Sequence, residues 1–288
     1  MGILLVIVSV VGGAALWLWL VLRFDKFEPE PLGTVLLVGL GAGLAGFFFA
    51  GMHNSLFDAF LGITYDHVLR WPDALASAVF VGINEELVKF WATVLLVFRL
   101  RQFNEPIDAA VYATAAALGF ASFENVFYAL DYGMVTLVVR LITAVPLHLG
   151  TAAVWSLGLA KAKFLGRSWF GASWPYLAVA AFIHAVYDFF IFVLPGEYSL
   201  VSLALSLVMA VGLIVFMVRR LKRLQRQSPF APGNVCPRCD AMNHPGSRFC
   251  AYCGAPIVQE FFKLCPGCGG KSLNGDRFCA KCGQALGG

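Results

Sequence analysis

Long apolar segments alternate with short polar loops over residues 1–220 of this 288-residue chain. A helix needs about 20 apolar residues to cross a bilayer. Segments of that kind are expected at residues 3–22, 33–52, 75–98, 107–130, 134–160, 174–194 and 199–218, the fifth tilted or broken near Pro146. The pattern predicts an all-α polytopic membrane protein of about seven transmembrane helices. The first segment lacks a basic region before it and is expected to be a retained span, with a cleaved signal peptide as the alternative.

Basic residues in the loops predict how these helices are oriented. When seven crossings are threaded, one side receives Arg23, Lys26, Arg99, Arg101, Lys161, Lys163, Arg167 and the basic run 219–226. The loops on the other side hold only Arg70. Because cytoplasmic loops carry an excess of lysine and arginine, we expect the N-terminus outside and the C-terminus in the cytoplasm of a bacterial cytoplasmic membrane.

Composition agrees with this class of protein. The chain is 59% hydrophobic and 13% charged, whereas soluble domains carry about 25% charged residues. The net charge of +4 is small, and five of the 21 lysine and arginine residues lie in RRLKRLQR at 219–226, directly after an apolar segment. Such a run is typical of the cytoplasmic end of a span and does not require a nucleic-acid partner.

All eight cysteines lie in a C-terminal repeat. CPRCDAMNHPGSRFCAYCG at 236–254 recurs as CPGCGGKSLNGDRFCAKCG at 265–283. Two C-x-x-C pairs in each copy satisfy a structural zinc ion, so we predict two tandem four-cysteine ribbons; the alternative, disulfides, is disfavoured in a reducing cytoplasm. The expected ligands are Cys236, Cys239, Cys250, Cys253, Cys265, Cys268, Cys279 and Cys282. The predicted domains are a transmembrane domain (1–220), a basic and proline-containing linker (221–235) and the ribbons (236–288).

Charged residues inside the third apolar segment need an explanation. An ionised side chain at mid-bilayer costs about 3 kcal/mol on insertion scales. Glu85 and Lys89 are four residues apart and therefore share a helix face, where they can pair. A purely structural ion pair leaves Glu86 unexplained, so we expect one of the two glutamates to act as a general base.

Three further apolar segments carry polar residues at similar depth. They are Glu124 in the fourth, His148 in the fifth, and His184 with Asp188 in the sixth. Taken singly, Glu124 can extend to the surface and a lone histidine is often a hydrogen-bonded core residue. At 1.5 Å per residue, however, the groups fall between the bilayer centre and about 9 Å from the outer surface. The sequence therefore predicts a shared hydrated pocket, suited either to water activation beside a carbonyl or to a proton relay.

The motifs EELVK at 85–89, FASFEN at 120–125 with Tyr128, His148, and HAVYD at 184–188 together resemble the PrsW family of intramembrane proteases. That family is similar in turn to the type II CAAX prenyl endopeptidases of the wider CPBP group. The resemblance covers residues 1–220 and implies an intramembrane endopeptidase. It implies that the catalytic residues are Glu85, Glu86, Glu124, His148, His184 and Asp188.

The resemblance also implies a substrate class and leaves two mechanisms. The substrate would be a single-span membrane protein, such as an anti-sigma factor in regulated intramembrane proteolysis. A catalytic zinc held by Glu85, Glu124, His148 and His184 is one mechanism. We favour the other, a glutamate-activated water with histidine oxyanion donors, because the chain has no H-E-x-x-H sequence.

The cysteine repeat resembles the double zinc-ribbon modules of many bacterial proteins. We expect it to dock a cytoplasmic protein partner. Nucleic acid is not the expected partner, because the repeat has no stripe of aromatic and basic residues. The alternative for the whole chain is a non-catalytic membrane receptor or scaffold; a transporter ranks third, since its halves show no inverted repeat.

Overall fold

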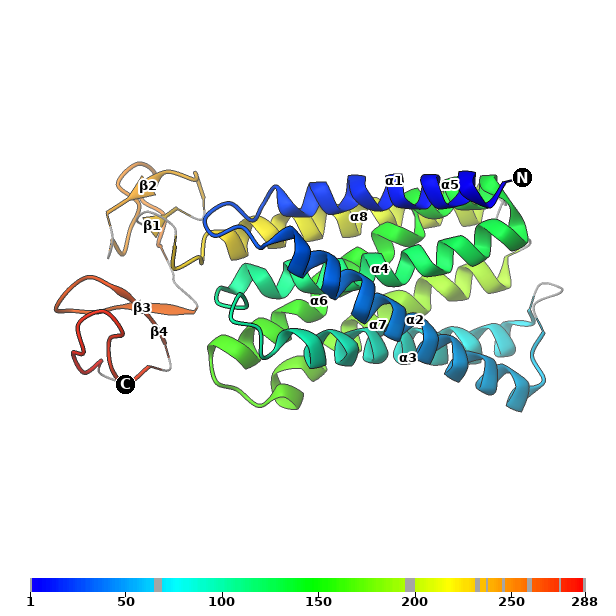
Figure 1. Cartoon of the computed structure of the whole chain (residues 1–288), viewed down its shortest axis with the longest axis horizontal. Helices are drawn as coiled ribbons and strands as arrows, with labels where there is room; N and C mark the ends of the chain where they lie inside the picture. The colour runs from blue at the N-terminus through cyan, green and yellow to red at the C-terminus, as the bar shows by residue number, and fades with distance from the viewer. Residues whose placement is uncertain are drawn as a thin grey trace.

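The chain forms a bundle of long helices with two small β-hairpins beyond one of its ends (Figure 1). The structure is a computed structural model that describes residues 2–64, 69–194, 200–230, 234–236, 238–244, 247–257, 261–274 and 276–286. The helices are α1 (Ile3–Leu22), α2 (Leu32–Leu61), α3 (Trp71–Val97), α4 (Pro106–Tyr132), α5 (Met134–Ile142), α6 (Ala144–Phe164), α7 (Trp169–Val193) and α8 (Leu200–Gln225).

All seven predicted segments are helical, and α5 with α6 makes up the fifth. Six of the described stretches are long and apolar enough to cross a membrane. Helix α3 corresponds to the remaining predicted segment and is 27 residues long, but Asp73, Glu85, Glu86 and Lys89 make it too polar to qualify by composition. The loops after α1, α3, α6 and α8, which carry the basic residues, all lie at the end of the bundle that faces the hairpins (Figure 1).

One predicted boundary was wrong, because helix α2 continues to Leu61 instead of ending at 52. The expected break in the fifth segment near Pro146 is confirmed and falls at Thr143, between α5 and α6. Pro146 itself sits in the first turn of α6, where a missing N–H is tolerated. Helix α8 runs to Gln225, so the first residues of the predicted linker are helical.

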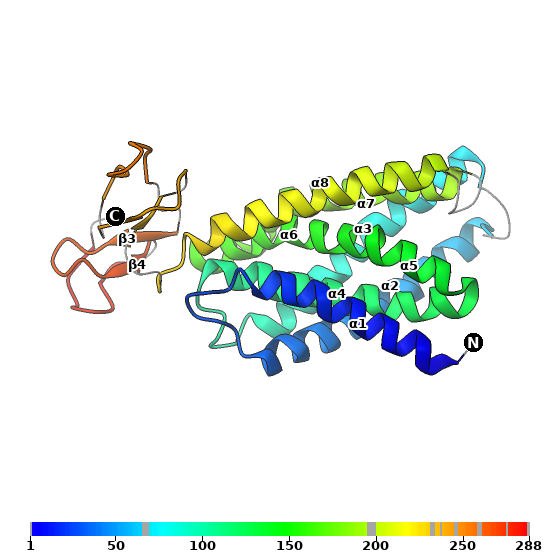
Figure 2. The same cartoon turned by 90° about the horizontal axis from the view of Figure 1, so that it is seen from above.

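Helices α4 and α6 form the centre of the bundle. In the most apolar stretch of α4, 83% of the residues are buried, and in that of α5 and α6 the share is 72%. In α1 the share is 11%, and this helix lies at the edge of the bundle (Figure 2). Small residues let the central helices approach closely. A Cβ atom on Gly119 of α4 would lie 1.8 Å from the Gly39 carbonyl oxygen of α2, so only glycine permits this crossing.

The C-terminal repeat folds into two antiparallel hairpins. The first pairs β1 (Asn234–Val235) with β2 (Met242–Asn243), and the second pairs β3 (Phe262–Leu264) with β4 (Lys271–Leu273). The second hairpin packs against the bundle. The ring of the buried Phe261 contacts Phe164 of α6 with centroids 6.3 Å apart, and Lys271 Nζ donates to the Ser228 carbonyl oxygen after α8 at 3.0 Å.

Candidate active site

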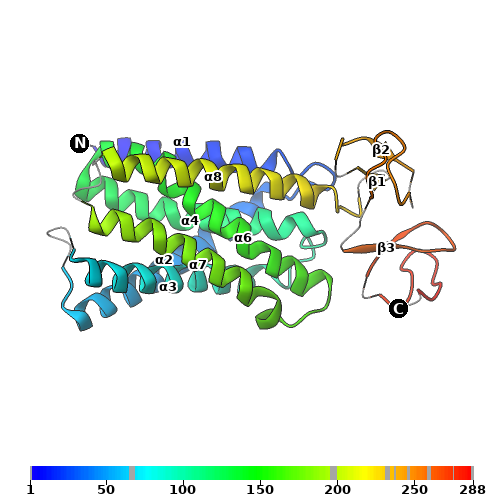
Figure 3. The same cartoon turned by 180° about the vertical axis from the view of Figure 1, so that it is seen from behind.

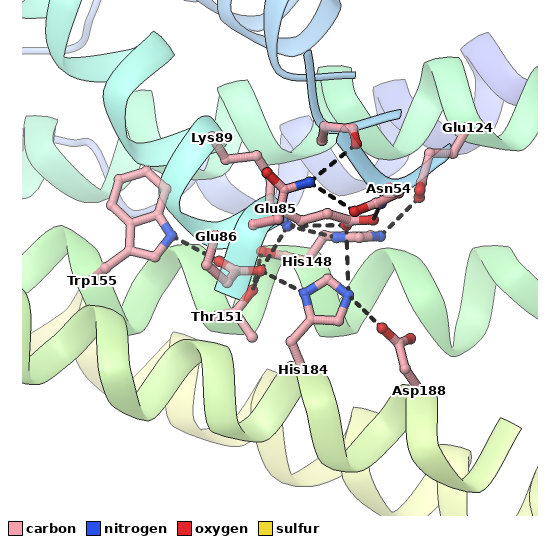
Figure 4. A network of polar contacts seen from close by, with 12 residues as sticks. Asn54, Glu85, Glu86, Lys89, Glu124, His148, Thr151, Trp155, His184 and Asp188 are labelled. Atoms are coloured by element: carbon pink, nitrogen blue, oxygen red, sulfur yellow. Dashed lines mark hydrogen bonds and ion pairs between the residues drawn. The ribbon is translucent and has the colours of Figure 1, made fainter. Parts of the chain in front are cut away.

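The polar residues predicted from four apolar segments meet in one buried network (Figure 4). Helix α3 supplies Glu85, Glu86 and Lys89, and α7 supplies His184 and Asp188. A glycine makes their meeting possible, because a Cβ atom on Gly82 of α3 would lie 2.8 Å from the backbone nitrogen of Ala185. The close contact of α3 with α7 therefore places the glutamate pair beside His184.

Glu86 is the anchor of the network. Its side chain is 0% exposed. Its Oε1 accepts hydrogen bonds from Lys89 Nζ at 2.6 Å and Thr151 Oγ1 at 3.1 Å, and lies 2.7 Å from His184 Nδ1. Its Oε2 accepts from Trp155 Nε1 at 3.0 Å. Four donors contact this carboxylate, which therefore links Lys89 and His184 to Thr151 and Trp155 of α6.

Glu85 has the opposite environment, although it is the adjacent residue. Its Oε1 accepts from Asn54 Nδ2 at 3.3 Å, while its buried Oε2 has no hydrogen-bond partner among the described residues. The nearest positive groups to Oε2 are His184 Nε2 at 3.6 Å and Lys89 Nζ at 3.9 Å. This unsatisfied oxygen faces the cavity and can accept a proton there.

His184 presents one nitrogen to the anchor and one to the cavity. With Nδ1 bonded to Glu86, its Nε2 lies 3.6 Å from Glu85 Oε2 and 3.5 Å from Asp188 Oδ2. Asp188 Oδ2 is also buried without a hydrogen-bond partner in the described structure. Three polar atoms therefore converge at a spacing that suits a water molecule bound among them.

His148 is held by groups from two helices, α3 and α4. Its Nδ1 lies 3.0 Å from Lys89 Nζ and its Nε2 lies 3.0 Å from Glu124 Oε2. Since lysine can only donate, His148 accepts at Nδ1 and donates its Nε2–H to Glu124. Arg140 of α5 donates to the same Glu124 oxygen at 2.9 Å and lies over the Tyr128 ring at 3.7 Å.

Sequence reasoning missed the contribution of α2. Asn54 contacts both Glu85 and Asn84, and His53 Nδ1 lies 3.0 Å from Asn84 Oδ1. These residues were excluded because the predicted segment ended at 52. The sequence HNSLFDAF keeps polar groups at helical spacing, a signal that the helix continues along α3. Thr151 and Trp155, which donate to Glu86, gave no signal because both residue types are common in apolar helices.

The network forms the floor of a cavity of about 640 Å³. Glu85, Glu124, His148, His184 and Asp188 all line the cavity, and Glu86 does not. The cavity is also lined by residues near the helix ends that lie opposite the hairpins: Leu69, Tyr132, Phe192 and Leu194. These residues lie at the ends of α3, α4 and α7 that are farthest from the hairpins (Figure 3), so the cavity extends toward that end of the bundle.

Three of the buried side chains in the network could also hold a metal ion. Glu85, His148 and His184 each offer one ligand atom, and the three atoms lie within 4.8 Å of one another. Two histidines and one glutamate are a ligand set that zinc uses in hydrolases, and the Glu86 contact to His184 is the usual outer support of such a ligand. The donors fit a zinc ion in type and number. Glu124, also predicted as a ligand, contacts His148 rather than joining this group.

The two cysteine sets fit structural zinc. In each ribbon the four Sγ atoms lie within 4.8 Å of one another. The Cys236 and Cys253 sulfurs are 3.5 Å apart and the Cys239 and Cys250 sulfurs 3.7 Å apart, distances close to the edge of a tetrahedron around zinc. The second set repeats this geometry, with 3.5 Å from Cys265 to Cys282 and 3.7 Å from Cys268 to Cys279.

Comparisons with known proteins agree with both parts of the chain. Residues 30–219 match the family described as "PrsW family intramembrane metalloprotease", and residues 236–283 match "Double zinc ribbon". Protease PrsW of Geobacillus kaustophilus is 30% identical over 184 residues, which cover 64% of this chain and 78% of that protein. Protease PrsW of Bacillus subtilis is 28% identical over 190 residues, covering 63% and 79%. No solved structure matches the chain.

Proposed function

The chain belongs to the PrsW family of intramembrane proteases, and from that premise we propose that it cleaves its protein substrate with a water molecule activated by Glu85. The observation that carries this mechanism is the convergence of two unsatisfied carboxylate oxygens on one imidazole. Glu85 Oε2 and Asp188 Oδ2 lie 3.6 Å and 3.5 Å from His184 Nε2 at the cavity floor. The family match favours a protease over the receptor or scaffold alternative.

In the first step, Glu85 takes a proton from the water as the water oxygen bonds to the carbonyl carbon of the substrate. The carbonyl oxygen becomes an oxyanion. A His184 ring protonated on both nitrogens keeps its Nδ1–H on Glu86 and directs its Nε2–H toward that oxyanion. Fixed donors of this kind contribute about 10²–10³-fold to the rate. Protonated Glu85 then gives its proton to the amide nitrogen, and the C–N bond breaks.

The remaining polar residues position these two. Glu86 fixes the orientation of His184, and Glu124 fixes that of His148, whose ring lies 5.2 Å from the His184 ring between centroids. Lys89 offsets the buried charge of Glu86, since its Nζ lies 2.6 Å from Glu86 and 3.9 Å from Glu85. Asp188 lies against the cavity face of His184 and stabilises the ring when it is protonated.

The direction of the cavity favours a particular substrate class. If the basic loops lie in the cytoplasm as the positive-inside bias predicts, the cavity opens toward the outer leaflet. A single-span membrane protein, for example an anti-sigma factor, would then be cut near the end of its span that lies in the outer leaflet. The ribbons would face the cytoplasm, where thiols stay reduced.

The metal mechanism is the second candidate, because one group of buried donors fits it. Glu85, His148 and His184 would hold the ion, which would supply a Lewis acid for the carbonyl and an acidic bound water. His148 would then have to exchange a present contact, since its two nitrogens already face Lys89 and Glu124. We favour the glutamate mechanism for that reason.

The test is cleavage of a panel of tagged single-span proteins by purified protein in detergent. The variants are Glu85→Gln and His184→Ala, with Asp131→Asn, an exposed carboxylate of the same bundle, as the matched control. Each is run with and without a chelator, and zinc per chain is counted. We expect cleavage by wild type and Asp131→Asn, and a loss of about 10²–10⁴-fold in Glu85→Gln.

The metal count separates the two mechanisms. Cleavage that persists when zinc falls to two or fewer per chain supports the glutamate mechanism. Cleavage that is lost with chelator and returns only with a third zinc assigns Glu85, His148 and His184 as ligands. Glu85→Gln with wild-type activity would refute both.

We also propose that the ribbons serve as a docking module for a cytoplasmic protein. Deleting residues 230–288 should change substrate choice or rate in cells while the bundle still cleaves in detergent. Unchanged substrate choice and rate after the deletion would exclude this role.

A further inference from the structure

A second polar centre lies at the other end of the bundle, next to the ribbons. The loop between α1 and α2 brings Asp25, Glu28 and Glu30 close to Glu105 and Asp108, which lie at the start of α4. Asp25, Glu105 and Asp108 each offer a ligand oxygen, and these oxygens lie within 4.8 Å of one another. The three side chains are 4%, 1% and 0% exposed.

Helix capping explains only part of this cluster. Asp108 Oδ2 accepts from the backbone N–H groups of Asn104 and Glu105, and Glu105 completes a capping box. Asp25 Oδ2 accepts from the Glu30 backbone at 2.7 Å. One oxygen of each carboxylate is thereby satisfied. The helix N-terminus accounts for those contacts, but not for the second oxygens.

The second oxygens are all buried and without partners. Within the described residues, five oxygens have no hydrogen-bond donor: Asp25 Oδ1, Glu28 Oε2, Glu30 Oε1, Glu105 Oε2 and Asp108 Oδ1. Unpaired buried carboxylate oxygens are costly, because nothing replaces their lost hydration. Five unpaired acceptor oxygens in one place indicate that a ligand able to accept their electron pairs binds there.

We propose that Asp25, Glu105 and Asp108 bind a hard divalent cation of the Mg²⁺, Mn²⁺ or Ca²⁺ class, with Glu30 as the nearest further carboxylate. The ligand set contains only oxygen, which suits these ions and not the thiolate-bound zinc of the ribbons. Lys271 of the second ribbon lies close enough to Glu105 for that carboxylate to affect its pKa.

Protonation is the other way in which the charge of these buried carboxylates can be neutralised. Burial raises the pKa of Asp25 to about 6, the pKa values of Glu30 and Glu105 to about 7, and the pKa of Asp108 to about 10. Protons are therefore the competing occupants near neutral pH, and an experiment must distinguish them from a metal ion.

The site would also join the two parts of the protein. Glu105 accepts a hydrogen bond from the Ser228 side chain, and Lys271 of the second ribbon donates to the Ser228 carbonyl oxygen at 3.0 Å. A cation bound at Glu105 would fix the segment on which the ribbon rests. Ion binding would then stabilise ribbon docking as well as the bundle.

The experiment titrates Mn²⁺ into full-length protein at constant ionic strength, after metal removal with a resin that leaves two zinc ions per chain. Electron paramagnetic resonance counts bound Mn²⁺, Mg²⁺ competes for the site, and thermal unfolding reports stability. We expect one Mn²⁺ per chain, displaced by excess Mg²⁺, and a rise in Tm of about 5 °C or more at saturation. The same result in Glu85→Gln would separate this site from the active site.

Asp108→Asn and Asp25→Asn are the decisive variants, because each keeps a capping oxygen and removes one charge. Both should unfold at or above the wild-type temperature in metal-free buffer and lose the Mn²⁺ response, while Asp131→Asn responds as wild type. A wild type with no Mn²⁺ response would overturn the proposal and assign protons as the neutralising group. A Mn²⁺ response that survives in both asparagine variants would overturn it too.

Discussion

Glu85→Gln and Glu86→Gln change adjacent residues, but the first should mainly abolish activity and the second should mainly lower stability. Glu86 accepts from Lys89, Thr151, His184 and Trp155. A glutamine has one acceptor oxygen and one NH₂ group, and the NH₂ group must face a donor in either orientation. The substitution also leaves the buried Lys89 without its closest counter-charge.

The expected loss of stability follows from these contacts. Removing one partner of a buried ion pair costs about 3–5 kcal/mol. For a bundle of this size each kcal/mol lowers Tm by about 2–4 °C, so Glu86→Gln should unfold about 6–20 °C below wild type. Glu85→Gln keeps an oxygen for Asn54 and removes the charge of an oxygen that has no donor. Its Tm should equal or exceed that of wild type.

Thermal unfolding in detergent and cleavage of one substrate measure both effects on the same preparations. We expect Glu85→Gln to be folded and inactive, and Glu86→Gln to be unstable, with a residual activity at low temperature that is lowered both by its smaller folded fraction and by the lost contact that orients His184. Equal Tm values for the two variants would refute the division of roles. So would a Glu86→Gln protein that is fully folded yet inactive, because that pattern marks Glu86 as the base.

Two further predictions concern residues that position the active site, and a third concerns zinc binding in the ribbons. Gly82→Ala should push α3 from Ala185, since the new Cβ atom would lie 2.8 Å from its backbone nitrogen; we expect at least a tenfold loss of kcat with α-helical content retained in circular dichroism. Arg140→Gln removes the 2.9 Å contact to Glu124 and should lower kcat more than it raises KM, while a Lys at the same position restores part of the rate. Cys250→Ser should reduce zinc from two to one per chain by elemental analysis, and an unchanged count of two would contradict the ribbon assignment.

The fold was largely predictable, because the length of each apolar segment determines whether it forms a membrane-spanning helix. Segments such as 3–22 coincide with the observed helix α1, since a bilayer-spanning helix needs few local cues. The errors arose where polar residues lie inside helices. Helix α2 passes the predicted end at 52 because His53 and Asn54 contact α3 instead of water, and a hydropathy pattern cannot distinguish these cases.

The site was predictable as a set of residues and not as an arrangement. Depth along each helix placed Glu124, His148 and His184 in one layer, and the structure brings them together. Rotation about each helix axis is set by packing at glycines such as Gly82 and Gly119. Those contacts link residues distant in sequence, so no local pattern reveals them.

The roles of the two glutamates show why rotation matters. Successive residues on a helix point about 100° apart, so only one carboxylate of an adjacent pair can face α6 while the other faces α2 and the cavity. Lys89 lies 1.3 Å closer to Glu86 than to Glu85, since the distances are 2.6 Å and 3.9 Å. Most of its charge therefore stabilises the anchor. Glu85 keeps an oxygen that no donor satisfies, and a buried carboxylate in that state gains more from taking a proton than a fully bonded one does. In the proposed mechanism, the ion pair that lowers the cost of placing α3 in a membrane would therefore also leave Glu85 free to take the proton from water.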